Sequence, residues 1–309
     1  MISCNNALAF VNFAAIIILS CAYFYHVGMA GIIVASPSHI EGTGDHYVIF
    51  CHGLGGSSDD FRNLKKGFNL EKHTLIFLGS VSGYKTLQYD INDAASMMFS
   101  EFIDLTKQSP KSIRLSEMKT LSMIGHSLGG LYAKALIYKM KEFDVVNDTA
   151  LENFITIATP HNGVVGFSDY NMYHPLKSVY DRFKKQFLMN FMRGVGPDLV
   201  NVSSIPVILS KDIIDAFKNR INYVGVHFDA SIPFWSGSMR LNETDLDFEN
   251  IKEYETELHE KTWKTFTVPL TPYHPLNHAN IIGKHLDGIF TFNKNRIRTI
   301  LNHINKWFG

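Results

Sequence analysis

Ser127 lies at the centre of a Gly-x-Ser-x-Gly motif, residues 125–129, and its hydroxyl is a candidate nucleophile. An apolar stretch, residues 121–124, precedes the motif, and a helix-prone segment, residues 131–137, follows it. This order predicts a nucleophile elbow, a sharp turn between strand and helix that exposes a serine in a strained backbone conformation. The N–H of Leu128 would then point at the oxyanion that forms when the serine attacks a carbonyl. The pattern predicts nucleophilic catalysis by Ser127, against the plainer interpretation of a turn made of small residues.

A second glycine-rich loop is placed to supply another oxyanion donor. Residues 46–51 are short, apolar and rich in β-branched and aromatic types, which predicts a buried strand. The loop after it, residues 52–56, has the sequence HGLGG. Serine hydrolases take one donor N–H from the residue after the nucleophile and one from a loop after an earlier strand, so Leu54 is expected to provide the second. His52 is expected to brace the loop, because it precedes the nucleophile and the catalytic histidine comes last in this chain order.

Three runs of sequence together resemble a known family. They are FCHGLGG at residues 50–56, GHSLGGLYAKALIY at residues 125–138 and FITIATPHNG at residues 154–163. They are similar to the "Putative serine esterase" family of lipase-like α/β-hydrolases, and the likeness extends over about residues 45–290. The resemblance implies an α/β-hydrolase fold: a mostly parallel, doubly wound sheet with a helical lid or cap inserted after the sixth strand. It also implies hydrolysis of carboxylic esters.

The acid of a catalytic triad is expected after a later strand. Residues 222–228 have strand character, and Asp229 follows them in a loop, where it could orient a histidine. This segment also resembles the part of the family that carries the acid. Asp245 and Asp247 are competitors, but they lie in an acidic stretch, residues 243–253, with no predicted strand before it. Asp229 is the predicted acid.

Three histidines follow the last predicted strand, residues 265–268: His274, His278 and His285. His278 precedes a small residue, a polar residue and an apolar pair, as in the family pattern, and is the predicted catalytic histidine. His274 is expected to line the loop and His285 to lie on a following helix. The spacing of His274 and His278 could suggest a metal site, but Pro275 argues against a helix there, so no metal or cofactor is expected.

The remaining sequence patterns describe one catalytic domain, residues 45–309. Strand and helix patterns alternate from residue 46 to residue 160, which is typical of parallel βαβ units. Residues 163–220 are predicted to form the lid or cap insertion. Within it, residues 176–192 form a basic amphipathic pattern that could be a lid or interfacial helix, or could pack on the core. Both interpretations stay open.

The N-terminal residues are strongly apolar. Residues 7–25 are apolar except for Asn12 and Ser20, and no Lys or Arg occurs before Arg62. A run of this length predicts a membrane anchor at residues 1–35, with a cleaved signal peptide, and hence secretion, as the alternative. Residues 36–44 are then a linker. The predicted location is the membrane, with a single N-terminal pass and the bilayer as a partner.

Composition excludes some functions. The 309 residues carry 29 Lys and Arg against 29 Asp and Glu, so nothing indicates a nucleic-acid partner. The three cysteines exclude a disulfide framework.

The sequence predicts a serine hydrolase that cleaves lipid acyl esters, such as acylglycerols or phospholipids, through a Ser127, His278 and Asp229 triad and an acyl-enzyme. The alternatives are a depalmitoylating thioesterase or amide hydrolase with the same triad, or a non-catalytic membrane-bound binding module.

Overall fold

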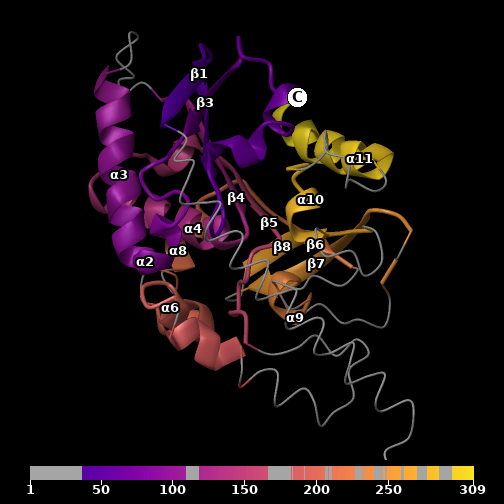
Figure 1. Cartoon of the computed structure of the whole chain (residues 1–309). Coiled ribbons are helices and arrows are strands. Elements are labelled where there is room, and N and C mark those ends of the chain that lie inside the picture. The colour runs from indigo at the N-terminus through magenta and orange to yellow at the C-terminus, as the bar shows by residue number, and fades with distance from the viewer. Residues whose placement is uncertain are drawn as a thin grey trace, which may run out of the picture.

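One eight-stranded sheet organises the chain (Figure 1). This computed structural model describes residues 37–108, 118–165, 182, 184–190, 192–205, 208, 211–226, 232, 234–239, 246–247, 249–258, 261–269, 277–284 and 294–309. The strands are β1 (His39–Gly42), β2 (His46–Cys51), β3 (His73–Phe77), β4 (Thr120–His126), β5 (Leu151–Ile157), β6 (Asn219–Gly225), β7 (Lys252–Leu258) and β8 (Lys261–Val268). Their spatial order is β1-β3-β2-β4-β5-β6-β8-β7. The six inner strands are parallel, and β1 and β7 pair antiparallel at the two edges.

Helices cover both faces of the sheet, with α3 and α4 on one side and α11 on the other (Figure 1). The helices are α2 (Lys85–Gln88), α3 (Ile91–Gln108), α4 (Leu128–Glu142), α6 (Gly196–Val200), α8 (Lys211–Asp215), α9 (Phe234–Gly237), α10 (Asn277–Asn280) and α11 (Lys294–Asn305), with short 3₁₀ turns η1 (Ser58–Phe61), η2 (Lys65–Gly67), η4 (Asp148–Ala150), η5 (Val202–Ser204) and η7 (Lys306–Phe308). Strand β2 shows why two layers form: Ile49 faces the α4 side, while Val48 and Phe50 face the α11 side. Both faces of an inner parallel strand are therefore buried.

The predicted fold class, a mostly parallel and doubly wound sheet, is confirmed, and the differences lie at its edges. The strand before the predicted insertion is β5, the fifth strand of the described residues, where the sequence analysis expects the sixth. The expected linker, residues 36–44, contains β1, and the acidic stretch near residue 250 leads into β7, which was not predicted. Both are edge strands with polar sequences. Glu253 and Glu255 on β7 are exposed, so the strand lacks the apolar pattern of a buried one.

The insertion between β5 and β6 is partly described. Residues 184–190 are helical, and Leu188 and Met192 are buried in the same core cluster as α4. Met189 on the same helical stretch is exposed. The lid itself stays a prediction, because most of residues 166–183 lie outside the described residues.

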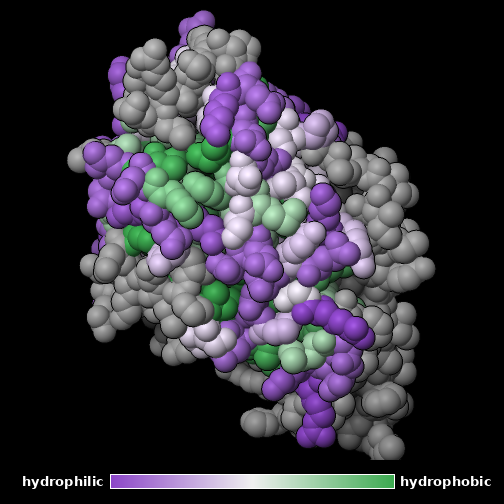
Figure 2. All heavy atoms as spheres, turned by 90° about the vertical axis from the view of Figure 1, so that its left-hand side faces the viewer, coloured by the Kyte–Doolittle hydropathy of each residue, from purple (hydrophilic) through white to green (hydrophobic). Residues whose placement is uncertain are grey.

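The predicted membrane pass is contradicted. Across the parts of the chain that the structure describes, no helix is both long and apolar enough to cross a membrane. Helix α3 has 18 residues, but it is amphipathic and carries four charged side chains, so it buries one face on the core and turns the other to a largely hydrophilic surface (Figure 2). Residues 1–35, on which that prediction was based, lie outside the described residues.

Candidate active site

Ser127 stands in a strained turn between β4 and α4. Its backbone has φ 57° and ψ −131°, a conformation that non-glycine residues rarely adopt. The Ser127 N–H donates to the carbonyl of Ile157 at 2.8 Å, and the Gly130 N–H donates to the Ser127 carbonyl at 3.0 Å. A side chain at Gly129 would overlap the carbonyl of Cys51, so only glycine lets α4 start this close to β2. These features are those of a nucleophile elbow.

His278 lies beside the Ser127 hydroxyl. The distance from His278 Nε2 to Ser127 Oγ is 2.7 Å, although the two residues are 151 positions apart. His278 is on α10. The two residues that follow this helix, Ile281 and Ile282, are buried in the core on the α11 side. This is the geometry in which an imidazole can take the proton of a serine hydroxyl. The competing histidines, at 274 and 285, lie outside the described residues.

The glycine-rich loop after β2 lies against the elbow. A Cβ at Gly53 would be 2.6 Å from the Cβ of Ser127, so the backbone of the loop touches the serine directly. The adjacent Leu54 is half-buried in this loop. The Gly55 N–H donates to Thr86 Oγ1 at 2.8 Å, which ties the loop to α2. Together with Leu128, the first residue of α4, the predicted oxyanion donors occupy two elements that adjoin the serine.

The predicted acid, Asp229, lies outside the described residues. The strand before it, β6, is parallel to β4 and ends at Gly225. The chain therefore leaves β6 on the side of the sheet where the carboxyl ends of the strands lie, as the elbow does. Of the competitors, Asp247 accepts the backbone N–H groups of Glu249 and Asn250 at 2.8 and 2.9 Å. That carboxylate is engaged in a local turn, while the competitor at position 245 lies outside the described residues.

A further histidine, His126, packs beside His278 and was not assigned this place from sequence. The rings of His126 and His278 have centroids 4.9 Å apart and are tilted by 37°, and His126 Nε2 donates to the His278 carbonyl at 2.8 Å. Burial, and next the neighbouring His278, hold the pKa of His126 well below its usual value, so this ring is neutral. His52 Nδ1 donates to the Gly53 carbonyl at 3.1 Å, the contact expected of a residue that braces the loop.

A buried polar chain fixes the turn after β5. Lys134, on α4, is only 4% exposed, and its Nζ donates to His161 Nδ1 at 3.2 Å. His161 Nε2 then donates to Thr156 Oγ1 at 3.1 Å, and that hydroxyl donates to Asn222 Oδ1 on β6 at 3.0 Å. Burial lowers the pKa of Lys134 from 10.5 to about 7. His161 therefore joins α4, β5 and β6.

The sequence of this chain matches a known family. The model of the family described as "Putative serine esterase" matches residues 41–241, well over half of the chain. The chain belongs to this family, and its class is that of the serine esterases, enzymes that hydrolyse carboxylic esters. No curated protein matches the sequence.

Several solved structures are similar at low sequence identity. An α/β-hydrolase superfamily protein from Enterococcus faecalis is 13% identical, with 88% of this chain and 94% of that chain covered and a TM-score of 0.49. A lipase from Bacillus licheniformis, BlEst2, is 14% identical, with 62% and 73% covered and a TM-score of 0.38. A lipase-esterase related protein from Clostridium acetobutylicum is 13% identical, with 59% and 65% covered and a TM-score of 0.32.

Proposed function

We propose that this protein hydrolyses lipid acyl esters through a triad of Ser127, His278 and Asp229. The observation that carries the proposal is the 2.7 Å contact between Ser127 Oγ and His278 Nε2 at a strained elbow. Asp229 is the acid, because it follows the carboxyl end of β6, and the elbow follows the carboxyl end of the parallel strand β4. The N–H groups of Leu54 and Leu128 form the oxyanion hole.

The reaction has two halves. As Ser127 Oγ attacks the ester carbonyl carbon, His278 Nε2 takes the hydroxyl proton, and the two N–H groups stabilise the negative oxygen of the tetrahedral intermediate. The imidazolium returns its proton to the departing alcohol, and an acyl-serine remains. Water then attacks the acyl-serine with His278 again as the base, which releases the acid and restores the serine. Asp229 would hold the imidazole in the tautomer that both steps need.

Half-buried apolar residues in the oxyanion loop and in the insertion after β5 support an acyl chain as the bound group. Half-buried Leu54 is in the oxyanion loop, and half-buried Val165 and Phe187 follow β5; all three pack against the core that contains α4. The N–H of Val164 donates to the carbonyl of Leu199 at 2.9 Å, which ties the start of the insertion to α6. Apolar side chains around a few polar donors are typical of sites for apolar ligands.

Labelling with a fluorophosphonate tests the proposed nucleophile. Wild type should be labelled and Ser127→Ala should not. Ser122→Ala is the matched control. Ser122, on β4, is a buried serine like Ser127, and its hydroxyl likewise contacts a histidine, His46, at 2.8 Å. Equal labelling of wild type and Ser127→Ala would refute the proposal. For the substrate, 4-nitrophenyl esters of increasing chain length should show kcat/KM rising with length, and a preference for acetate would refute the lipid assignment.

A further inference from the structure

Two segments far apart in the sequence meet beside the proposed site: η1, which follows the oxyanion loop, and the turn at residues 277–284 that carries His278. Lys284 Nζ lies 2.7 Å from Asp60 Oδ1. Three residues further along, Asn63 Nδ2 donates to the carbonyl of Gly283 at 2.8 Å. The Asp60 side chain is 7% exposed and that of Lys284 is 32% exposed, so the carboxylate is the buried partner.

Asp60 also lies against the oxyanion loop itself. A Cβ at Gly56 would be 2.5 Å from Asp60 Oδ2 and 3.1 Å from His52 Nδ1. The carboxylate and the His52 ring therefore both touch the backbone of the loop at this residue. The negative charge of Asp60 partly offsets the effect of burial on the pKa of His52, which remains below its usual value. One carboxylate thus contacts the oxyanion loop and the histidine turn together.

The histidine turn has little structure of its own. Helix α10 has four residues, and it ends with the Gly283 N–H bonded to the Asn280 carbonyl at 2.9 Å and the Lys284 N–H bonded to the Ala279 carbonyl at 3.2 Å. One helical turn is not stable by itself, so its position must be set by tertiary contacts. Those contacts include the bond from His126 to the backbone of His278, the ion pair with Asp60 in η1 and the bond from Asn63, two residues after η1.

We propose that Asp60 and Lys284 are positioning residues, whose ion pair holds the turn carrying His278 against the oxyanion loop. This inference rests on the proposed function. Proton transfer needs a heavy-atom distance of about 2.6–3.2 Å, and a shift of about 1 Å can cost about 10²-fold in rate. The ion pair sets that distance without touching the substrate, and it fixes the base and the oxyanion donors relative to each other.

The test compares an aryl ester with an alkyl ester. A nitrophenolate can leave without a proton, whereas an alkoxide needs the proton of the His278 imidazolium. A displaced histidine should therefore harm the alkyl ester more. Lys284→Gln should lower kcat/KM about 10-fold for 4-nitrophenyl butyrate and about 100-fold for ethyl butyrate, mainly through kcat. Lys284→Arg should restore most of the loss, because it keeps the charge.

Lys65→Gln is the matched control. Lys65 forms an ion pair with Glu41 at 2.5 Å, both side chains are 29% exposed, and Glu41 is on the edge strand β1. This variant should keep both kcat/KM values. If Lys284→Gln does not fold, Asp60→Asn combined with Lys284→Gln carries the test, because it leaves no buried charge unpaired.

The outcomes separate the two proposals. An active wild type, with the Lys284→Gln or double variant within twofold of it on both esters, would overturn the positioning role alone. An equal loss on both esters in proportion to the folded fraction would also overturn it, because that result shows a purely structural pair. A wild type that hydrolyses neither ester and is labelled no better than Ser127→Ala would overturn the proposed function and this inference with it.

Discussion

Strand β4 carries a serine–histidine contact at each end, and the two differ in what surrounds them. At the carboxyl end, Ser127 contacts His278 at 2.7 Å, and at the amino end Ser122 contacts His46 at 2.8 Å. Ser122 lies within β4, where the pairing with β5 shifts register between Leu121 and Met123, and its hydroxyl also accepts the N–H of Asn153 at 3.1 Å. Ser127 has φ 57° and is followed at once by a helix. The short distance between hydroxyl and imidazole is therefore common to both serines, and the strained turn followed by a helix is found at Ser127 and not at Ser122.

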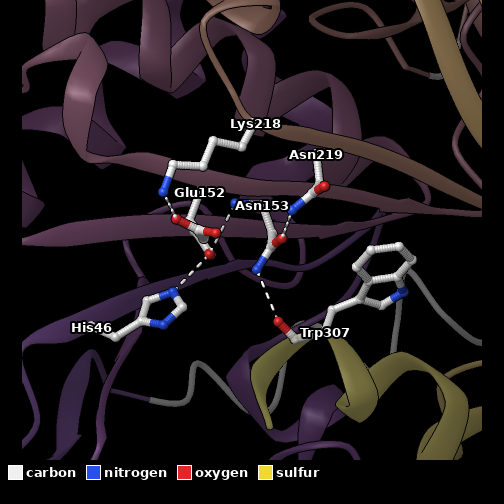
Figure 3. A network of polar contacts seen from close by, with 7 residues as sticks. His46, Glu152, Asn153, Lys218, Asn219 and Trp307 are labelled. Carbon is white, nitrogen blue, oxygen red and sulfur yellow. Dashed lines mark hydrogen bonds and ion pairs between the residues drawn. The ribbon is translucent and has the colours of Figure 1, made fainter.

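The amino end belongs to a polar network that ties strands to the C-terminus (Figure 3). Asn153 Nδ2 donates to the Trp307 carbonyl at 3.1 Å, and its Oδ1 accepts from Asn219 Nδ2 at 2.9 Å. Lys218 pairs with Glu152 at 2.6 Å. At the carboxyl end, by contrast, His126 Nδ1 and Thr159 Oγ1 are buried with no hydrogen-bond partner among the described residues. The carboxyl end therefore holds a strained residue and two unpaired polar atoms, whereas hydrogen bonds and an ion pair link the side chains of the amino-end network.

The largest expected effect separates the two contacts by activity. Ser127→Ala, His278→Ala and Asp229→Asn should each lower kcat by roughly 10⁴-fold, and double variants should lose little more, because a triad acts as a unit. His46→Gln should leave kcat per folded molecule within twofold. Steady-state kinetics on 4-nitrophenyl butyrate measures this. An active His278→Ala, with a crippled variant at position 274 or 285, would reassign the histidine.

The next effect separates them by stability. Ser122→Ala should lower the free energy of unfolding by about 2 kcal/mol, since it leaves the Asn153 N–H and His46 Nε2 unsatisfied. Ser127→Ala should lower it less, because it removes the contact with His278 Nε2 alone, whereas Ser122→Ala removes contacts with both His46 and Asn153. Urea unfolding of both variants gives the comparison. A larger loss from Ser127→Ala would contradict the division between the two ends.

Lys134, the buried lysine on α4 that contacts His161, should make the free energy of unfolding depend on pH above neutrality. Its pKa is about 7 in the folded protein and 10.5 ordinarily, so between these values the unfolded chain binds more protons. The free energy of unfolding should therefore rise with pH across this range, by at most about 1.4 kcal/mol per pH unit. Lys134→Met should lack the rise, as measured by urea unfolding at pH 7, 8 and 9. An unchanged slope would show that the folded lysine keeps its proton.

His46, at the amino end of β4, should make the free energy of unfolding depend on pH below neutrality. Burial is the main cause that lowers its pKa from 6.5 to about 4. The unfolded chain takes up a proton first as the pH falls, so stability should be lost between about pH 6.5 and 4. The contribution is at most about 1.4 kcal/mol per pH unit, and less because the ring is partly exposed. His46→Gln should show a shallower loss, with the remainder due to groups such as His52 and His126. Equal slopes would refute this assignment.

The smallest effect is expected from an exposed ion pair next to the amino-end network. Lys119 contacts Asp45 at 2.5 Å, and the two side chains are 74% and 59% exposed. Lys119→Gln should change neither kcat/KM nor the melting temperature measurably, because solvent screens exposed charges. A clear drop in melting temperature would mean that surface charges also hold this end together.

The sequence by itself determined the local parts of the site. The elbow around Ser127 and the loop of Leu54 are encoded in a few adjacent residues, because close backbone approach there requires glycine at particular positions. Strand β2 spans the predicted residues 46–51, because its apolar run is nearly continuous and both of its faces are buried. The more polar inner strands β6 and β8 begin at Asn219 and Lys261, ahead of the predicted segments 222–228 and 265–268. The edge strands β1 and β7 could not be predicted from apolar runs, because their sequences are polar and part of their surface faces water.

Only the tertiary structure decided which distant side chains meet. It brought His278 to Ser127 across 151 residues, packed His126 beside that histidine and paired Asp60 with Lys284. The local sequence marks Ser127 by the glycines on either side of it, but it does not show that Ser122 meets His46 or that Ser127 meets His278. Such pairings depend on how whole elements pack, because a side chain's partner is fixed by the folds of two segments at once and not by its neighbours in the chain.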